Sequence, residues 1–363
     1  MIISSLKVEN FRNYSNESLT FSKGLNILMG QNAQGKTNLL EAIYLCAIGK
    51  SYRTSKESLF IKQGENKAKI SINLVKQSGD ESISLRFSHK EKKQVFINDI
   101  LVRKLSELIG EVNIVFFFPE DLKLIKEAPQ DRRRFMDIDI SQASKSYLYL
   151  LQRYEKILNQ RNKLIKTSSS IEVLNRTISI WDEQLSEVAS KIIYARIKFI
   201  NRLKPHVEKM HRDLTGEDAC LTISYQGVTG ESSAEIKAKL LEIYSTSHEK
   251  DYELKFTSTG PHRDDIKIML DGIDLRSMGS QGQQRTAALA LKLAELDIFE
   301  NELNERPILL LDDVFSELDH NRRNRLIQVA LRQQTFIACT DLAGTQVNED
   351  FNIIKIKNGS VER

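Results

Sequence analysis

The chain has 363 residues with a formal net charge of +4, and 40% of its residues are hydrophobic and 28% charged. This ordinary globular composition allows one large domain with an insertion, or two domains. The first residues lack the basic-then-apolar pattern of a signal peptide, and no apolar run approaches the length of a membrane span. We therefore expect a cytoplasmic protein with no membrane partner. Cys46, Cys220 and Cys339 are scattered, which excludes a disulfide framework and a cysteine metal cluster.

A short apolar run at residues 25–29, expected to be a strand, leads into the sequence GQNAQGKT and then into a helical pattern. The spacing matches the phosphate-binding loop G-x-x-x-x-G-K-[ST]. Its glycines let backbone N–H groups point at phosphate oxygens, and the next helix adds the positive end of its dipole. We expect Lys36 to reach the β- and γ-phosphates of a nucleotide and the Thr37 hydroxyl to bind Mg²⁺. The predicted nucleotide contacts in this loop are Gly30, Gln31, Asn32, Ala33, Gln34, Gly35, Lys36, Thr37 and Asn38.

Residues 66–101 alternate apolar and polar side chains between turn-prone segments, which predicts an antiparallel meander stacked on the nucleotide-binding sheet. From about residue 145 to residue 214, apolar residues recur at spacings of three and four, with a polar break at 167–170. This pattern predicts an antiparallel helical hairpin. We expect Pro205 to kink or split its second helix.

The predicted hairpin carries most of the positive charge. Residues 145–212 hold 14 Lys or Arg against 6 Asp or Glu, an excess of +8 that leaves the remainder of the chain near −4. Such a segment is either a solvated helix face or a surface for a phosphate backbone, and charge alone does not choose. The candidate DNA contacts are Lys163, Lys166, Arg196 and Lys198.

Two further segments follow. Asp271-Gly272 marks a β-hairpin, and directly after it Ser280 is a plausible N-cap for a helix. The Ser, Gly and Gln residues at this helix start also suit a second anion-binding terminus.

Further on, the apolar run 308–311 reads as a buried parallel strand that ends in Asp312 and Asp313. We expect Asp312 to hold Mg²⁺ and Asp313 to orient the attacking water. The 276 residues between Lys36 and Asp312 indicate a large insertion between two halves of one sheet and disfavour a P-loop kinase.

The segments GQNAQGKT, SQGQQ and ILLLDDVFSELD resemble the ATP-binding-cassette (ABC) ATPases and, more narrowly, the SMC-like heads. With LKVENFRNY, GPHRDD at 260–265 and GSQGQQR at 279–285, the chain is similar to the RecF family of bacterial recombination mediators. This resemblance implies an α/β fold, with an ABC-ATPase-type P-loop head, a meander and an inserted helical lobe. The head would comprise 1–115 and 252–363, and the lobe 116–251, with its hairpin at about 145–214.

The same resemblance implies the site. Two copies would sandwich two ATP molecules, with the loop of one copy facing Ser280, Gly282 and Gln283 of the other. Asp312 matches the magnesium acid, and Asp313 stands where transporter ATPases carry a catalytic glutamate. Residues 316–319 match the D-loop of a dimer interface. Arg12 resembles a basic contact near the nucleotide, although a structural arginine at a strand end fits nearly as well.

Two departures from the pattern stand out. Thr340, followed by Asp341, occupies the position of the switch histidine of transporters. The Q-loop glutamine has no clear counterpart in FPEDLKLIKEAPQDRRRF, where the cluster Arg132 to Arg134 would contact DNA, nucleotide or nearby acids.

The resemblance implies an ATP-dependent DNA-binding protein of recombinational repair and replication restart, linked to the SOS response. It would be a weak DNA-dependent ATPase using ATP and Mg²⁺. Its ATP-bound dimer would hold duplex DNA near single-stranded gaps in the nucleoid and help load recombinase with RecO and RecR. The alternatives are a transporter nucleotide-binding subunit, which would usually carry the switch histidine, and an SMC-like structural ATPase, which would need far longer helices.

Overall fold

The computed structural model describes residues 1–342 and 351–362, which form two compact units. The first unit comprises Met1–Leu122, Met210–Asp218 and the segment from Ala288 onward, and the second comprises Lys123–Lys209 and Ala219–Ala287. Residues 252–287, placed in the head by the sequence analysis, lie in the second unit. None of the helices in the described part of the chain has the length and hydropathy that a membrane crossing requires.

The first unit contains a six-stranded, mostly parallel sheet whose central strands are apolar and buried on both faces. A strand covered on both faces needs such a continuous apolar run, which explains the predicted strands at 25–29 and 308–311. In spatial order the strands are β15 (Ser360–Glu362), β14 (Asn352–Lys357), β3 (Leu25–Met29), β13 (Thr335–Cys339), β12 (Ile308–Asp312) and β8 (Ile114–Phe117).

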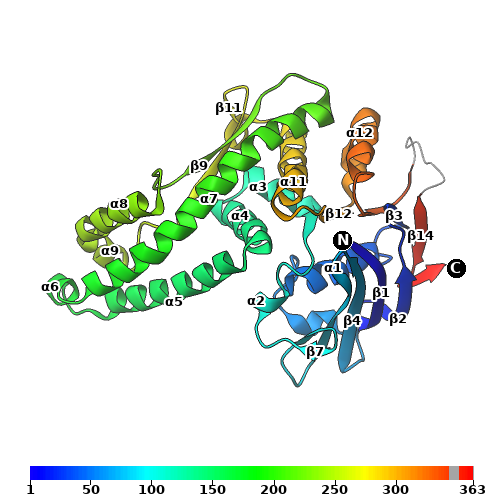
Figure 1. Cartoon of the computed structure of the whole chain (residues 1–363), viewed down its shortest axis with the longest axis horizontal. Coiled ribbons are helices and arrows are strands. Elements are labelled where there is room, and N and C mark those ends of the chain that lie inside the picture. Colours follow the sequence, from blue (N-terminus) through cyan, green and yellow to red (C-terminus); the bar gives the residue numbers. More distant parts are fainter. Residues whose placement is uncertain (343–350, 363) are drawn as a thin grey trace. The chain divides into compact units, whose positions relative to one another are not determined.

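A second, antiparallel sheet of the first unit contains the predicted meander, which is confirmed as β4, β5 and β6. Helix α1 (Lys36–Ile48) packs against β4 and β5 of this sheet and against β13, β12 and β8 of the parallel sheet; Figure 1 shows it beside β4. The strands are β2 (Tyr14–Thr20), β1 (Ile2–Phe11), β4 (Lys67–Lys76), β5 (Gly79–Ser88), β6 (Gln94–Ile97) and β7 (Ile100–Leu101). The strands are connected by four short helices, η1 (Glu57–Phe60), α2 (Leu105–Leu108), η2 (Pro119–Leu122) and η3 (Val314–Glu317). The first unit also contains α12 (His320–Ala330) and most of α11 (Gln281–Leu303).

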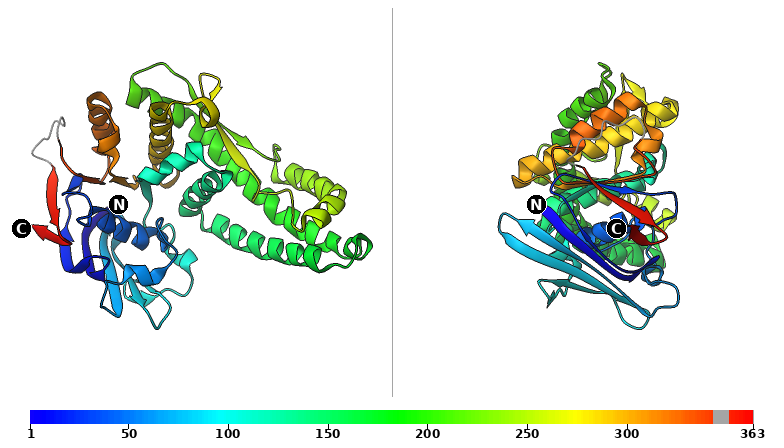
Figure 2. Two further views of the ribbon diagram at one scale, coloured as in Figure 1. Left: turned by 180° about the vertical axis from the view of Figure 1, so that it is seen from behind. Right: turned by 90° about the vertical axis from the view of Figure 1, so that its right-hand side faces the viewer.

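The second unit contains most of the predicted helical hairpin, formed by α5 (Lys145–Thr167) and α7 (Ile178–Thr215), of which the residues from Met210 onward belong to the first unit. Figure 1 and the left view of Figure 2 show the two helices converging at α6 (Ile171–Asn175). The expectation that Pro205 splits the second helix is wrong, because α7 is continuous through it. Leu203 and Val207 on either side are fully buried, so packing holds both halves in one helix despite the hydrogen bond that proline removes.

Shorter elements complete the second unit. The hairpin predicted at Asp271-Gly272 is confirmed as β10 (Asp265–Leu270) and β11 (Ile273–Asp274), and β10 also pairs with β9 (Leu221–Gln226). The helices are α3 (Lys123–Lys126), α4 (Pro129–Ala143), α8 (Ser233–Thr246), α9 (His248–Leu254) and α10 (Leu275–Met278).

Candidate functional site

The candidate site lies at the carboxyl ends of the parallel strands in the first unit. β13 lies between β3 and β12 and is parallel to both, with Ala338 opposite Leu28 on one side and Asp312 on the other. The loop after β3 and the carboxylate at the end of β12 therefore meet at one sheet edge, where open α/β sheets bind their ligands.

Two glycines of the loop 30–37 are fixed by backbone geometry. A Cβ on Gly30 would lie 2.3 Å from the carbonyl oxygen of Ile356 in β14, so any side chain there would clash with backbone. Gly35 has a φ of 118° and leads directly into α1. Only glycine adopts this conformation readily.

The loop is also held from outside by Asn13 and the β14–β15 turn. The Asn13 amide donates to the Gln34 carbonyl at 3.0 Å and accepts from the Asn38 side chain at 2.8 Å. The backbone N–H of Gly359 donates to the Gln34 carbonyl at 3.0 Å. The loop is therefore shaped by contacts on both sides, which keeps its open N–H groups in place for an anion.

Lys36 folds back over this loop. Its Nζ donates to the carbonyl oxygens of Gly30 at 2.6 Å and Gln31 at 2.8 Å, and burial lowers its pKa. A polyphosphate would offer this cation a stronger partner than two neutral carbonyls, because charge-assisted hydrogen bonds are roughly twice as strong as neutral ones.

Thr37 and Asp312 meet across the fold. The Thr37 hydroxyl donates to Asp312 Oδ1 at 3.0 Å, although the two residues are 275 positions apart. Burial raises the pKa of Asp312 to about 6, and neighbouring Asp313 adds to the effect. The pair thus joins a hydroxyl with a buried carboxylate.

These two residues fit a magnesium ion. Hydroxyl and carboxylate oxygens are ligands that Mg²⁺ accepts, usually together with substrate phosphates and water. Within the described residues, no three His, Cys, Asp or Glu side chains form a metal-binding group. The remaining ligands would therefore come from the nucleotide and water.

Asp313 lies one residue beyond β12. It adopts a left-handed conformation with a φ of 49°, and its N–H donates to the Ala338 carbonyl at 3.0 Å. The Ser316 hydroxyl donates to the Asp313 carbonyl at 2.8 Å, which ties the start of the predicted D-loop 316–319 to the acid. Its last residue, Asp319, caps α12.

β8 ends next to Asp312 and leads to a carboxylate that sequence reasoning did not assign. Phe117 of β8 pairs with Leu311, so the chain leaves β8 beside the end of β12. Three residues later Glu120 contributes, as a lesser cause, to the raised pKa of Asp312. The segment after β8 thus brings the Glu120 carboxylate near that of Asp312.

Arg12 contacts a second carboxylate that the sequence analysis missed. Its guanidinium donates to both oxygens of buried Glu41 on α1, at 2.9 and 2.7 Å, and to the Leu59 carbonyl at 3.0 Å. Glu41 also accepts from Ser51 Oγ at 2.5 Å and lies 3.5 Å from Arg53. In this structure Arg12 clamps the helix that follows the loop, which is the structural role left open above. The apolar neighbours of Glu41 in α1 indicate burial, but its partner Arg12 lies 29 positions away, so sequence reasoning did not pair the two.

Thr340 lies directly after β13, and its hydroxyl reaches Asp341 at 3.4 Å. Both side chains are exposed at the sheet edge that carries the loop and Asp312. No imidazole stands at this position.

Ser280 and Gln283 form a capping box at the start of α11, in the second unit. The Gln283 N–H donates to Ser280 Oγ at 3.3 Å, and the Ser280 N–H donates to Gln283 Oε1 at 2.9 Å. The predicted cap is therefore confirmed. A Cβ added to Gly282 would meet no atom within 4 Å, so nothing in this fold requires glycine there.

Comparison with known proteins decides the family. Residues 2–360 match the RecF/RecN/SMC N terminal domain. The DNA replication and repair protein RecF of Clostridium acetobutylicum is 42% identical over 99% of both chains, and that of Lachnoclostridium phytofermentans is 43% identical over 100% of both. The chain belongs to the RecF family.

Solved structures agree with this assignment. A RecF–ATP structure, of the recombination mediator protein in the RecFOR pathway, is 35% identical with a TM-score of 0.90, covering 99% of this chain and 96% of that one. The Smc head domain from Pyrococcus furiosus, 17% identical with a TM-score of 0.59, shares the fold alone. The expected ABC-ATPase and SMC-like head fold is confirmed.

In this RecF-family chain, Arg132 of the arginine cluster binds a nearby carboxylate and Arg133 a nearby backbone carbonyl. Arg132 is buried and makes a two-point contact with Asp265, at 2.5 and 2.9 Å. Arg133 donates to the Asp264 carbonyl at 2.8 Å. The GPHRDD segment therefore supplies one carboxylate and one backbone carbonyl that hold α4 against the start of β10, while Arg134 remains exposed.

The candidate DNA contacts on the hairpin divide into buried and exposed residues. The assignment of Arg196 to an exposed surface is wrong: it is 2% exposed and binds Asp137 at 2.8 Å and the Pro261 carbonyl at 2.6 Å. Lys163, Lys166 and Lys198 are exposed, as expected for a surface that contacts a ligand.

Proposed function

We propose that the chain is an ATP-driven DNA-binding switch of recombinational repair. The observation that carries the proposal is the 3.0 Å contact between Thr37 and Asp312, which brings the phosphate-binding loop and the acidic strand end into one site. Loop N–H groups and Lys36 would bind the nucleotide phosphates, while Thr37 and Asp312 would hold Mg²⁺. ATP is the nucleotide named for the solved RecF relative.

ATP binding would close a homodimer in which each loop faces Ser280, Gly282 and Gln283 of the second copy. Two features of the α11 start support this. Its N-terminus is a suitable anion site, and Gly282 leaves space that the fold itself does not use. A backbone without a side chain allows close approach of a phosphate. Arg12 would act through Glu41 on the helix that follows the loop.

Hydrolysis would be slow and would reopen the dimer. Asp313 is the carboxylate one residue beyond the metal-binding acid, where it would orient the attacking water. Aspartate reaches less far than the glutamate of transporter ATPases, and Thr340 replaces their histidine. Both substitutions favour a weak, DNA-dependent ATPase that acts as a switch.

The closed dimer would hold duplex DNA near single-stranded gaps, using the exposed lysines of the α5–α7 hairpin. Contacts to the DNA backbone need cations on a rigid support and carry little sequence information. RecO and RecR are the partners expected from the RecFOR pathway in which the solved relative acts. In this proposal the protein also helps to load recombinase, acts in the SOS response and is located in the nucleoid.

The proposal is tested with Lys36→Met, which removes the charge on the phosphates. We expect the variant to lose ATP-driven dimerisation, measured by light scattering with and without ATP and Mg²⁺. Exposed Lys23→Met in the same unit is the matched control and should dimerise normally. A folded Lys36→Met protein that dimerises with ATP like the control would overturn the proposed nucleotide sandwich.

A further inference from the structure

Strand β10 has one incompletely paired edge. It pairs with β9 along its whole length, from Asp265 to Leu270, but with β11 at Met269 and Leu270 alone. Backbone groups of alternate residues in an antiparallel strand point to opposite neighbours. Because Leu270 faces β11 across the tight turn, the N–H and C=O groups of Ile266 and Ile268 point the same way, beyond the end of β11. Such an edge is a template for another strand.

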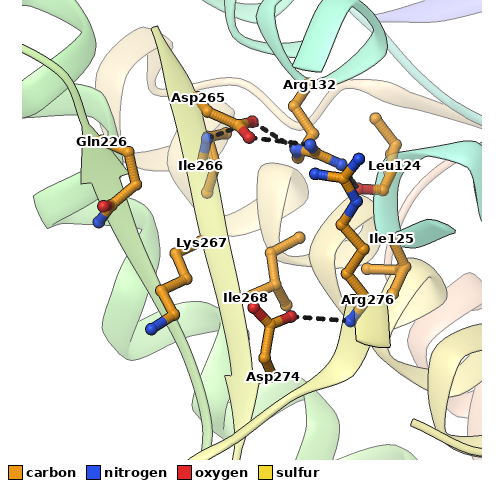
Figure 3. Close-up of a pocket in the computed structure, with 10 residues that line it drawn as sticks. All are labelled: Leu124, Ile125, Arg132, Gln226, Asp265, Ile266, Lys267, Ile268, Asp274 and Arg276. Carbon is orange, nitrogen blue, oxygen red and sulfur yellow. Dashed lines mark hydrogen bonds and ion pairs between the residues drawn. The ribbon is translucent and has the colours of Figure 1, made fainter. Parts of the chain in front are cut away.

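A cavity of about 310 Å³ lies against this edge, between β10, α3, the start of α4 and α10. Figure 3 shows Ile268 and Asp265 of β10 on one side and Leu124, Ile125, Arg132 and Arg276 on the other. The Ile266 N–H is covered by the Asp265 carboxylate at 2.7 Å. In the described part of the chain, the Ile268 N–H has no such partner on this side.

The charges around the cavity are unevenly matched. Asp265 is shared between the Arg132 guanidinium and the Ile266 N–H. In Figure 3 the Arg276 guanidinium points toward that of Arg132. Among the described residues the Arg276 guanidinium makes no ion pair, and the Asp274 carboxylate accepts from the Arg276 backbone N–H at 2.9 Å as a helix cap. The Arg132 guanidinium therefore has a carboxylate partner in Asp265, whereas that of Arg276 is left for a ligand.

We propose that this open edge of β10 binds an extended acidic segment of a partner protein. The segment adds as a strand beside Ile266 and Ile268, and one of its carboxylates pairs with Arg276. Main-chain hydrogen bonds supply affinity in this mode of recognition, and side-chain pockets supply specificity. Leu124 and Ile125 offer an apolar wall for the residue next to the carboxylate. The cavity lies at the lower end of the about 300–1,000 Å³ range of ligand pockets, which suits a short stretch of chain.

The test uses the full chain and a fluorescein-labelled hexapeptide of alternating valine and glutamate. Arg276→Gln should weaken binding by about tenfold, since a hydrogen bond to a charged group is lost. Arg176→Gln removes the same charge from an exposed position on the hairpin tip and should leave affinity unchanged. Peptide binding should also slow hydrogen exchange at the Ile268 amide.

Three controls separate this mode from others. The same peptide with every amide N-methylated has no N–H group to donate to the strand edge, so equal binding of that peptide would refute strand addition. An unprotected Ile268 amide in the bound state would refute it as well. Displacement of the peptide by inorganic phosphate at equal concentration would show a small-anion site instead. An Arg276→Gln variant that binds the peptide normally would refute the proposed pairing of Arg276 with a carboxylate of the partner.

Discussion

Reversing the charge of Lys163 and Lys166 tests the proposed DNA surface directly. Both lysines are exposed on α5 and lie three residues apart, so they share one helix face. If each contacts a phosphate of duplex DNA, loss of two contacts lowers the log–log salt slope by about 1.8. Between about 50 and about 200 mM salt, the affinity of the double variant should therefore fall about tenfold less than that of the parent.

The measurement is fluorescence anisotropy of a labelled duplex at several salt concentrations, with ATP and Mg²⁺. Two unrelated duplex sequences should give the same slope, because backbone contacts carry no sequence information. ATP-driven dimerisation serves as the folding control. Lys90→Glu with Lys92→Glu makes the same charge change in the exposed β5–β6 loop. An unchanged slope and affinity in a dimerising Lys163/Lys166 variant would refute the hairpin surface, and a lowered slope in the control pair would place DNA on the meander.

Three further predictions concern the nucleotide site. Asp313→Asn should accumulate the ATP-bound dimer in size-exclusion chromatography, and hydrolysis at the parent rate would contradict the role of Asp313. Ser280→Arg should bind fluorescent ATP as a monomer yet fail to close, and its mixture with Lys36→Met should restore at most one composite site. The Asp312 carboxyl has a pKa raised to about 6, so it is ionised above that pH and protonated below it. Mg²⁺ affinity measured by calorimetry with ATP should therefore fall at least about tenfold between pH 7.5 and pH 5, and Asp312→Asn should leave only the part of this dependence that comes from the ATP phosphates.

Sequence reasoning found the parts of the site that are formed by residues close together in the sequence. The loop 30–37, the helix N-cap at Ser280 and the strand ending at Asp312 each follow from residue types at short spacing. It did not show that β13 lies between β3 and β12, because strand order depends on packing across the whole sheet. Nor did it reveal Glu41 or Glu120, each of which acquires its neighbours through contacts far away in sequence.

Arg196 was misread, and Arg161 was given no role, for a different reason. Arg161 is four residues after Ile157 and four before Ile165, so it lies on the apolar face of α5. Arg196 has the same relation to Ile192 and lies three residues before Phe199 on α7. Both positions on the stripe indicate burial, but the acids that neutralise them belong to other helices and cannot be paired by sequence alone.

These buried charges also bear on the proposed DNA surface. Arg161 bonds Asp182 of α7 at 2.8 Å and Asp251 of α9 at 2.7 Å. Removing one partner of a buried ion pair costs about 3–5 kcal/mol, so the contacts join α5, α7 and α9 firmly. With the buried Arg161, Arg196 and Asp182 set aside, residues 145–212 still hold 12 Lys or Arg against 5 Asp or Glu. Burial therefore fixes the hairpin while leaving its positive surface almost intact, which is the combination that a sequence-independent grip on a phosphate backbone requires.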